Sequence, residues 1–436
     1  MKKKLSAIVM CIVIMLVSVI PAYAVKNNIN FETKTDILYL VNLDTDTVVY
    51  SKNSDKKCYP ASTTKIMTYI IVSENISDVE GTKVEIKQEV LDRLAGTDSS
   101  LAGVQGYVGA ELSILQLLKC MMISSGNDAA EVLADYVGGG KTEEFVKLMN
   151  AKAAELGCRN THFVNAHGLH DDEQYTTAED MSKIARYAMT KPYFMDITNT
   201  VEYYVDGDAE EPLINTNKMI NPDEKDYYYK YAKGVKTGTT DEAGHCLVST
   251  ALKDNVSYMC IAYNAPCYDA NGDWEETNYA ILESKKVYEW AYANVTMREV
   301  LGNSASVGTV NVKYGDGADK VNLIPEYAYS TMLDKNIKDK DIVISAKCQN
   351  EVDAPVKRGT VLGTATVSYK GEELTKVNLI AEKDVNKSDL LYFKAVAENI
   401  VKTPLFIIIT IVVLLLFIIY VIFVLSVSDK RKKNKQ

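Results

Sequence analysis

The sequence predicts an α/β (α+β) domain, then a small all-β domain, and finally a C-terminal transmembrane helix. Three observations support this architecture. Strand-like runs occur near both ends of residues 28–298, with helical periodicity between them. Short alternating runs follow over residues 302–388. A long apolar run and a block of basic residues end the chain.

The N-terminus predicts a secretory signal peptide over residues 1–24. Three lysines at residues 2–4 precede an apolar run, and Ala22-Tyr23-Ala24 then supplies the small residues of a cleavage site. The alternative is an uncleaved signal anchor, which the helix-breaking Pro21 disfavours. We therefore expect the main part of the chain that follows the signal peptide to lie outside the cytoplasm.

Composition narrows the class of protein. A chain of 436 residues exceeds one ordinary domain, and 47% hydrophobic residues suffice for a sizeable core. The formal net charge is −10 although both termini are basic, so the body is acidic and nucleic acid is not expected as a partner. The cysteines are scattered without a CxxC pair, so we interpret Cys246 and Cys260, on neighbouring expected strands, as buried free thiols.

The first domain is expected over residues 28–298. Residues 37–50 predict a β-hairpin around Asp44-Thr45-Asp46. From about residue 91 to residue 195 the pattern is mostly helical, with breaks at 138–140 and 160–172. A second hairpin is predicted around Lys253-Asp254-Asn255, and residues 283–300 form an amphipathic run spaced to pack on a sheet.

The second domain, residues 302–388, is expected to be all-β. Its predicted strands are residues 306–312, 320–324, 341–346, 360–369 and 373–379. We find no candidate nucleophile, metal cluster or phosphate loop in this segment, and interpret it as a stalk or interaction module. Residues 389–403 are expected to be a linker.

Residues 404–427 predict a transmembrane helix that anchors the chain in the cytoplasmic membrane. As a helix this run spans about 35 Å, slightly more than a hydrocarbon core of about 30 Å. Residues 428–436 contain five basic side chains, a flank that is retained on the cytoplasmic side. We expect a single-pass topology, with the tail in the cytoplasm.

Three short motifs point to a chemistry. Ser62 and Lys65 follow Pro60 at the entry of an expected helix, where residues three apart share a face. A lysine amine of lowered pKa can take the proton of a serine hydroxyl, and a helix N-terminus favours an oxyanion. Ser125-Gly126-Asn127 precedes a helix-like segment, and Lys236-Thr237-Gly238 opens a strand-like run. Ser-x-x-Lys alone is weak evidence, but the ordered set is specific.

In this form the set resembles the low-molecular-mass penicillin-binding proteins, the serine D-alanyl-D-alanine carboxypeptidases, with Gly126 in place of the usual Asp. The resemblance covers about residues 30–390 and implies a β-lactamase/penicillin-binding-protein-like catalytic domain. Four flanking segments are similar as well: Thr161–Asn165, His167–Leu169, Thr176–Met181 and Asn215–Asn217.

The resemblance implies a role for each residue of the three motifs. Ser62 would attack the carbonyl between two D-alanines of a peptidoglycan stem pentapeptide, with Lys65 as general base. Ser125 and Asn127 would relay a proton and hold the substrate amide. β-Lactam antibiotics would acylate Ser62, and no metal or cofactor is expected.

Substrate binding would fall to Lys236, Thr237, Gly238 and Thr239. The resemblance places Lys236 near the substrate carboxylate and assigns the backbone N–H groups of Ser62 and Thr239 to an oxyanion hole. Thr240 is a weaker candidate for a carboxylate contact. Some relatives have His where this chain has Thr239.

Other interpretations remain open at this point. A β-lactamase would use the same acylation, but it needs a water-activating Glu, and no Glu-x-x-Leu-Asn element follows Ser125. A wall-binding scaffold with a vestigial site is disfavoured by the intact motifs. Zinc at His162, His167 and His170 is disfavoured by their spacing and by Gly168.

Two further features allow more than one interpretation. Ser125 could also cap the helix that follows it. The Tyr227-Tyr228-Tyr229 cluster could line a cleft or anchor a solvated loop.

Overall fold

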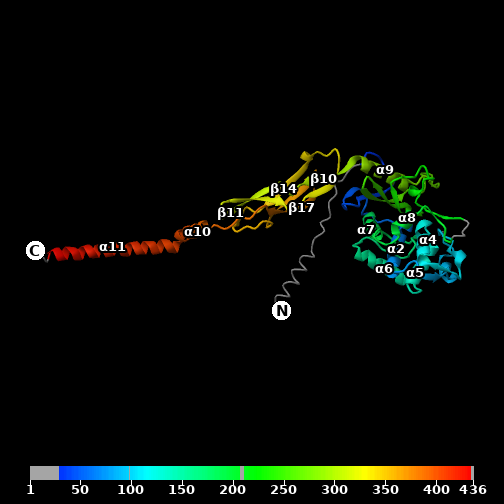
Figure 1. Ribbon diagram of the computed structural model, residues 1–436, viewed down its shortest axis with the longest axis horizontal. Helices are drawn as coiled ribbons and strands as arrows, with labels where there is room; N and C mark the ends of the chain where they lie inside the picture. The colour runs from blue at the N-terminus through cyan, green and yellow to red at the C-terminus, as the bar shows by residue number, and fades with distance from the viewer. Residues whose placement is uncertain (1–28, 98, 207–210, 434–436) are drawn as a thin grey trace. The chain divides into compact units, whose positions relative to one another are not determined.

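The computed structural model describes residues 29–433, except residues 98 and 207–210 (Figure 1). The predicted signal peptide, residues 1–24, lies outside the described residues. The chain divides into two compact units. The first contains the residues up to Arg298 together with Ser330–Asp341, and the second contains Glu299–Tyr329 and the chain from Ile342 onward.

The first unit is built on a five-stranded antiparallel sheet in the order β2-β1-β9-β8-β7. Both predicted hairpins are confirmed, and β1 pairs with β9, so the N-terminal hairpin joins the sheet made by later residues. Strand β7, which contains Lys236-Thr237-Gly238, lies at one edge of the sheet. The strands are β1 (Ile37–Asn42), β2 (Val48–Lys52), β7 (Ala232–Thr240), β8 (Gly244–Lys253) and β9 (Val256–Ala265).

Helices cover both faces of this sheet. Along β1, Ile37, Tyr39 and Val41 belong to one apolar core and Leu38 and Leu40 to another, as the two-residue period of a strand requires. The first core joins the sheet to a helical block, and the second joins it to α9 (Tyr279–Asn294).

The centre of the helical block is α2 (Lys65–Asn75), whose residues 65–72 are all buried. Its apolar residues face neighbours on every side, which explains why the helix is nearly uniformly hydrophobic. The surrounding helices are α3 (Gln88–Leu91), α4 (Ile114–Ile123), α5 (Asn127–Val137), α6 (Thr142–Glu155), α7 (Ala178–Ala188) and α8 (Phe194–Thr198). Short strands accompany them: β3 (Lys83–Glu85), β4 (Glu111–Ser113), β5 (Glu202–Tyr203) and β6 (Leu213–Ile214).

The amphipathic run predicted over residues 283–300 is only partly a helix. Helix α9 ends at Asn294, and β10 (Val295–Leu301) follows directly and pairs with β13 (Tyr329–Asp334). Within this strand, residues 296–300 alternate between partly buried and exposed, a two-residue period typical of a strand and not of a helix. The prediction beyond residue 294 was therefore wrong.

The second unit contains a six-stranded sheet in the order β14-β16-β17-β12-β11-β15. The five predicted strands are confirmed. The short β15, which pairs in parallel with β11, was not predicted. The strands are β11 (Gly308–Lys313), β12 (Lys320–Pro325), β14 (Ile342–Cys348), β15 (Glu351–Asp353), β16 (Val361–Tyr369) and β17 (Glu372–Ala381).

The C-terminal segment is helical. The expected linker, residues 389–403, is largely occupied by α10 (Asp389–Lys402), whose N-cap Ser388 accepts a hydrogen bond from Leu391 N. Helix α11 (Pro404–Lys433) follows. Within the described residues, Pro404–Leu425 is long and apolar enough to cross a membrane, judged by length and composition. The described residues contain seven cysteines, all free thiols, and Cys246 and Cys260 are buried, as predicted.

Candidate active site

Ser62 lies on a short 3₁₀ turn, η1 (Ala61–Thr64), which leads directly into α2 at Lys65. In a 3₁₀ turn the side chains of residues three apart are eclipsed. Lys65 Nζ accordingly lies 2.9 Å from Ser62 Oγ. The predicted helix entry is confirmed, with 3₁₀ rather than α geometry at the serine.

The Lys65 amine is held by three oxygen atoms. Besides its contact with Ser62, Nζ donates to Asn127 Oδ1 and to the backbone carbonyl of His167, each at 2.6 Å. A neutral amine has two N–H groups and one lone pair. Because Asn127 Oδ1 and the His167 carbonyl can only accept, they take both N–H groups and leave the lone pair for the Ser62 hydroxyl.

Electrostatics favour this neutral form. Lys65 is fully buried, and burial followed by the charge of Lys236 holds the pKa of Lys65 well below its ordinary value. Asp128 acts in the opposite direction. The arrangement therefore suits an amine that takes the proton of Ser62.

The Ser125-Gly126-Asn127 segment faces Lys65 from the start of α5. Helix α5 begins at Asn127 with Gly126 as its N-cap, so the capping role considered for Ser125 was wrong. Ser125 instead has a left-handed φ of 65° and lines the cleft. Asn127 Nδ2 donates to Ser99 Oγ at 3.2 Å, and the Asn127 backbone N–H donates to the Ser100 carbonyl at 2.8 Å.

The glycine at position 126 has a local cause. A Cβ at this position would lie 2.5 Å from Ala102 Cβ and 2.7 Å from Asp128 Oδ1. Asp128 in turn accepts from the backbone N–H groups of Ala102 and Val104. The close approach of this loop to α5 therefore excludes a side chain at residue 126, including the Asp found in the usual motif.

Strand β7 supplies the second side of the site. Lys236 is buried, and burial lowers its pKa to about 7. Thr237 Oγ1 donates to Thr216 Oγ1 at 2.6 Å. A Cβ at Gly238 would lie 2.8 Å from Ser62 N, so the absence of a side chain lets β7 approach the nucleophile turn. Thr239 Oγ1 lies 3.0 Å from His245 Nδ1 on β8.

The motifs meet at a cleft of about 340 Å³, which falls within the usual size of ligand sites. Ser62, Ser125, Thr237, Gly238 and Thr239 all line it. Thr216 belongs to a segment that the sequence singled out. Nine further described residues line the cleft. The sequence either gave no sign that they belong to a site or, for Tyr227, gave an ambiguous one: Ser100, Lys218, Tyr227, His245, Trp274, Glu275, Glu276, Asn278 and Ile281.

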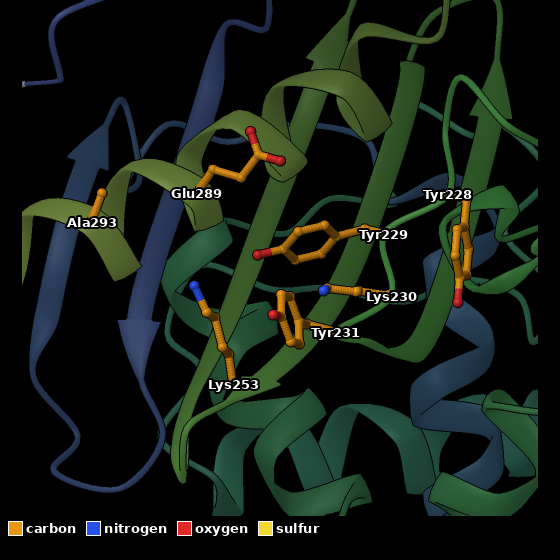
Figure 2. A pocket seen from close by; sticks show the side chains of 7 residues that line it. All are labelled: Tyr228, Tyr229, Lys230, Tyr231, Lys253, Glu289 and Ala293. Carbon is orange, nitrogen blue, oxygen red and sulfur yellow. The ribbon is translucent and has the colours of Figure 1, made fainter.

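The tyrosine cluster is divided between two places. Tyr227 lines the active-site cleft. Tyr228 and Tyr229 line a separate pocket together with Tyr231 and Lys253 (Figure 2). The interpretation that the cluster lines the cleft therefore holds for Tyr227, whereas Tyr229 is buried in the apolar core.

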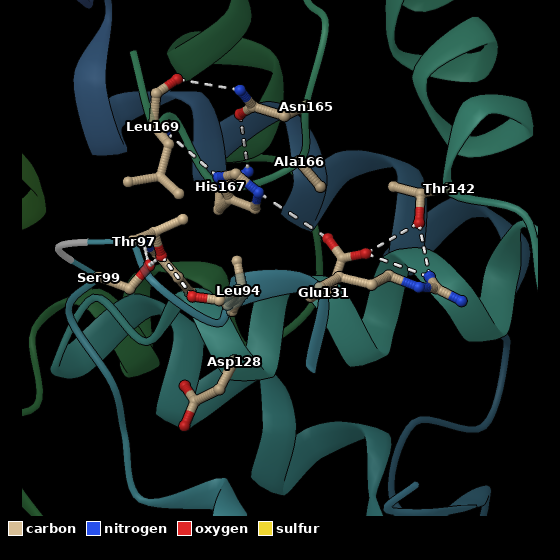
Figure 3. Close-up of polar contacts among 12 residues, drawn as sticks. Leu94, Thr97, Ser99, Asp128, Glu131, Thr142, Asn165, Ala166, His167 and Leu169 are labelled. Atoms are coloured by element: carbon tan, nitrogen blue, oxygen red, sulfur yellow. Dashed lines mark hydrogen bonds and ion pairs between the residues drawn. The ribbon is translucent and has the colours of Figure 1, made fainter. Parts of the chain in front are cut away.

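The carbonyl that fixes Lys65 belongs to a tightly held loop (Figure 3). Asn165 Oδ1 accepts from Gly168 N at 2.7 Å, and Asn165 Nδ2 donates to the Leu169 carbonyl at 2.9 Å. His167 Nδ1 accepts from Leu169 N at 3.2 Å, which leaves Nε2 to carry the proton. The loop thus presents the His167 carbonyl to Lys65 in one orientation.

Behind this loop lies a buried carboxylate (Figure 3). Glu131 Oε2 is 3.9 Å from His167 Nε2, and Oε1 accepts from Arg93 at 3.2 Å and from Thr142 Oγ1 at 2.9 Å. Burial, then the charge of Lys65, lowers the pKa of His167 to about 3. The imidazole is therefore neutral, and its contact with Glu131 is not an ion pair.

The catalytic unit packs a five-stranded sheet against a helical block. Ser-x-x-Lys lies at a helix entry and faces an edge strand that carries Lys-Thr-Gly. This combination defines the class of penicillin-binding-protein-like serine enzymes. A family profile described as D-alanyl-D-alanine carboxypeptidase matches residues 24–267, and the penicillin-binding protein 5 C-terminal domain matches residues 296–387. The chain belongs to the D-alanyl-D-alanine carboxypeptidase family.

Individual relatives agree with this assignment. The chain is 30% identical over 403 residues to D-alanyl-D-alanine carboxypeptidase DacF of Bacillus subtilis, covering 90% of this chain and 97% of DacF. The crystal structure of DacD from Francisella tularensis has a TM-score of 0.64 at 24% identity, covering 84% of this chain and 98% of that one, and supports the fold alone. The Streptomyces K15 DD-transpeptidase structure has a TM-score of 0.52 at 28% identity, covering 62% and 100%.

These findings confirm the predicted fold class, a penicillin-binding-protein-like catalytic domain followed by an all-β domain. They also confirm the predicted enzyme class, a serine-type D-Ala-D-Ala carboxypeptidase, over the β-lactamase and scaffold alternatives.

Proposed function

We propose that this chain removes the terminal D-alanine from peptidoglycan pentapeptide stems through an acyl-enzyme on Ser62. The observation that carries the proposal is the environment of Lys65. Its two N–H groups are occupied by Asn127 Oδ1 and the His167 carbonyl, so its lone pair faces Ser62 Oγ. That is the arrangement a general base requires.

Acylation then proceeds in defined steps. Ser62 Oγ attacks the carbonyl between the two D-alanines while its proton passes to Lys65 Nζ. The backbone N–H groups of Ser62 and Thr239 stabilise the oxyanion. The proton then moves, with Ser125 on its path, to the amine of the departing D-alanine, and water hydrolyses the ester.

Lys236 attracts the substrate carboxylate. With a pKa of about 7 it is partly protonated in the free enzyme at neutral pH. An arriving carboxylate favours the charged form and completes the protonation. β-Lactam antibiotics acylate Ser62 by the same route, since their ring carbonyl takes the place of the peptide carbonyl.

The enzyme is anchored in the cytoplasmic membrane by Pro404–Leu425, with the catalytic unit outside and residues 428–436 inside. Support comes from the length and hydrophobicity of the helix and from the five basic residues that follow it. Protease added to intact, wall-stripped cells should digest the catalytic unit. A protected catalytic unit would contradict this topology.

The function is tested with the full chain in detergent micelles. Diacetylated Lys-D-Ala-D-Ala is added and free D-alanine is measured. We expect release by the wild type and none by Ser62→Ala, which should also lose covalent labelling by penicillin while keeping its fold. Labelling at another serine, or release of D-alanine by the variant, would contradict the assignment.

A further inference from the structure

A second pocket lies in the catalytic unit, apart from the active-site cleft (Figure 2). Its volume is about 440 Å³, which falls within the usual size of ligand sites. Its walls come from residues 228–231, from Lys253 at the end of β8, and from Glu289 and Ala293 of α9. The described residues that line the cleft are a different set. The pocket is therefore distinct from the active site.

The tyrosines of this pocket are held in place by the sheet and by α9. Tyr229 N donates to the Met219 carbonyl at 2.9 Å. Leu252 N, on β8, donates to the Tyr231 carbonyl at 2.9 Å. The Tyr229 ring stacks on Tyr288 of α9, with centroids 6.0 Å apart and planes 3° from parallel. Because the rings are already fixed, a ligand orders few side chains when it binds.

The tyrosine hydroxyls around the pocket fall into two groups. Tyr288 and Tyr292 donate theirs to backbone carbonyls of β8, at 2.8 and 2.9 Å. The hydroxyls of Tyr229 and Tyr231 form no hydrogen bond with any described residue, although Tyr229 is only 6% exposed. A buried tyrosine hydroxyl usually has a hydrogen-bond partner. These two hydroxyls are therefore available to a ligand in the pocket.

Two lysines bring positive charge to the same space (Figure 2). Lys230 Nζ lies 4.8 Å and Lys253 Nζ 5.3 Å from the centroid of the Tyr231 ring, a distance at which the ring attracts an ammonium group. Neither lysine forms an ion pair with any described residue. In a chain with a formal net charge of −10, these ammonium groups make the pocket a place where an anion can bind.

The end of α9 adds an acceptor to the pocket. The C-terminus of a helix carries partial negative charge. Here Lys335 Nζ donates to the Ala293 carbonyl at 2.7 Å and offsets part of that charge. Glu289 is exposed and lines the pocket one turn earlier. Its carboxylate accepts hydrogen bonds, so the pocket suits a ligand that has donor groups as well as an acid group.

We propose that this pocket binds an acidic carbohydrate, a sugar ring that carries a carboxylate or a phosphate. The acid group is held by Lys230 and Lys253. The apolar face of the ring packs on the Tyr231 side chain. Hydroxyl or amide groups of the sugar bond to Tyr229 Oη and to Glu289. A bare anion lacks the donors that Glu289 requires, and a neutral sugar leaves both ammonium groups without a partner.

The pocket and the cleft share one segment of the chain. Tyr227 lines the cleft, and the next residue, Tyr228, lines the pocket. Glu289 and Ala293 are exposed at the rim, so the bound sugar can belong to a longer polymer. If the enzyme acts on stem peptides, as proposed above, the pocket holds the wall polymer while the cleft acts on a stem. Binding at the pocket does not itself require that function.

The first experiment measures binding of three sugars to the full chain in detergent micelles by saturation-transfer NMR titration. The probes share one ring: N-acetylglucosamine is neutral, N-acetylmuramic acid adds a carboxylate, and N-acetylglucosamine 1-phosphate adds a phosphate. We expect at least one acid to bind about tenfold more tightly than the neutral sugar, the size of one hydrogen bond to a charged group. The acid that binds more tightly identifies the preferred group.

Variants locate the binding site. Lys230→Met and Lys253→Met should each reduce the preference for the acid, and the double variant should abolish it. Tyr229→Phe keeps the ring but removes the hydroxyl, and should weaken binding of all three sugars about fivefold. Lys225→Met is the matched control, because Lys225 is exposed on the same segment and does not line the pocket. Thermal unfolding checks that each variant is folded.

Three results would overturn the inference: no measurable binding of either acid, equal affinity for neutral and acidic sugars, or a preference that the double lysine variant retains. A further titration uses enzyme treated with penicillin, with acylation of Ser62 verified by the increase in mass. Binding that persists supports a separate pocket, whereas binding that is lost places the sugar in the cleft and also overturns the inference. If penicillin does not acylate the enzyme, the proposed function fails, and the lysine variants still decide whether the pocket binds the acid.

Discussion

Replacing Gly238 with alanine should separate the two halves of the active site. The new methyl group would lie 2.8 Å from Ser62 N and 2.9 Å from Ala61 Cβ. Non-bonded heavy atoms ordinarily come no closer than about 3.5 Å, so β7 and the nucleophile turn must move apart by roughly 0.6 Å. The obstructing atoms are backbone atoms and a Cβ, which cannot rotate away. The movement would displace Ser62 from the backbone N–H of Thr239, the proposed oxyanion donor.

A displacement of this order at the reacting groups costs up to about 100-fold in rate, and overpacking costs about 1–3 kcal/mol of stability. The acylation rate is measured with a fluorescent penicillin under single-turnover conditions, and stability by thermal unfolding. Gly106→Ala is the matched control, because nothing lies within 4 Å of its added Cβ and its φ is not positive. Wild-type acylation by Gly238→Ala would refute the reasoning.

Three further predictions concern the polar groups of the site. Lys65→Ala should slow penicillin acylation by several orders of magnitude, whereas a near wild-type rate would place the base elsewhere. Because Lys236 loses its proton above its pKa of about 7, kcat/KM for diacetylated Lys-D-Ala-D-Ala should fall about tenfold per pH unit above that value. Lys236→Arg should remove this decline, and an unchanged alkaline limb would contradict the assignment. Glu131→Gln should loosen the loop that carries the His167 carbonyl and lower kcat/KM about tenfold. Asp135→Asn, which alters only the other carboxylate bound by Arg93, should not.

Much of the fold could be predicted because its signals are local. The hairpins, the strands of the second unit and the apolar C-terminal helix each show their own periodicity or length. The error at residues 295–301 has a physical cause: this segment pairs with β13, which begins 28 residues after Leu301 in the sequence. A strand that depends on a distant partner cannot be recognised from the local pattern of apolar residues alone.

The residues of the site that belong to contiguous motifs could be predicted from the sequence. Contacts between residues on different strands or loops could not. Ser62 and Lys65 lie on one turn, so their spacing alone brings them together. His245 meets Thr239 only because β7 pairs with β8 in a particular register, and Ser99 meets Asn127 only through a loop that folds onto α5. Neither contact can be deduced from composition or spacing. The capping role considered for Ser125 failed because the helix begins two residues later.

Strand β7 has a consequence for how a peptide binds. Within the described residues it has a strand neighbour, β8, on one side only. An extended peptide can therefore add to the sheet as a further strand, with main-chain hydrogen bonds giving affinity whatever its side chains. Such an open edge also invites association between protein molecules. Thr237 Oγ1, on this strand, hydrogen-bonds Thr216 Oγ1. In the proposed function, the same edge would hold the substrate peptide as an added strand.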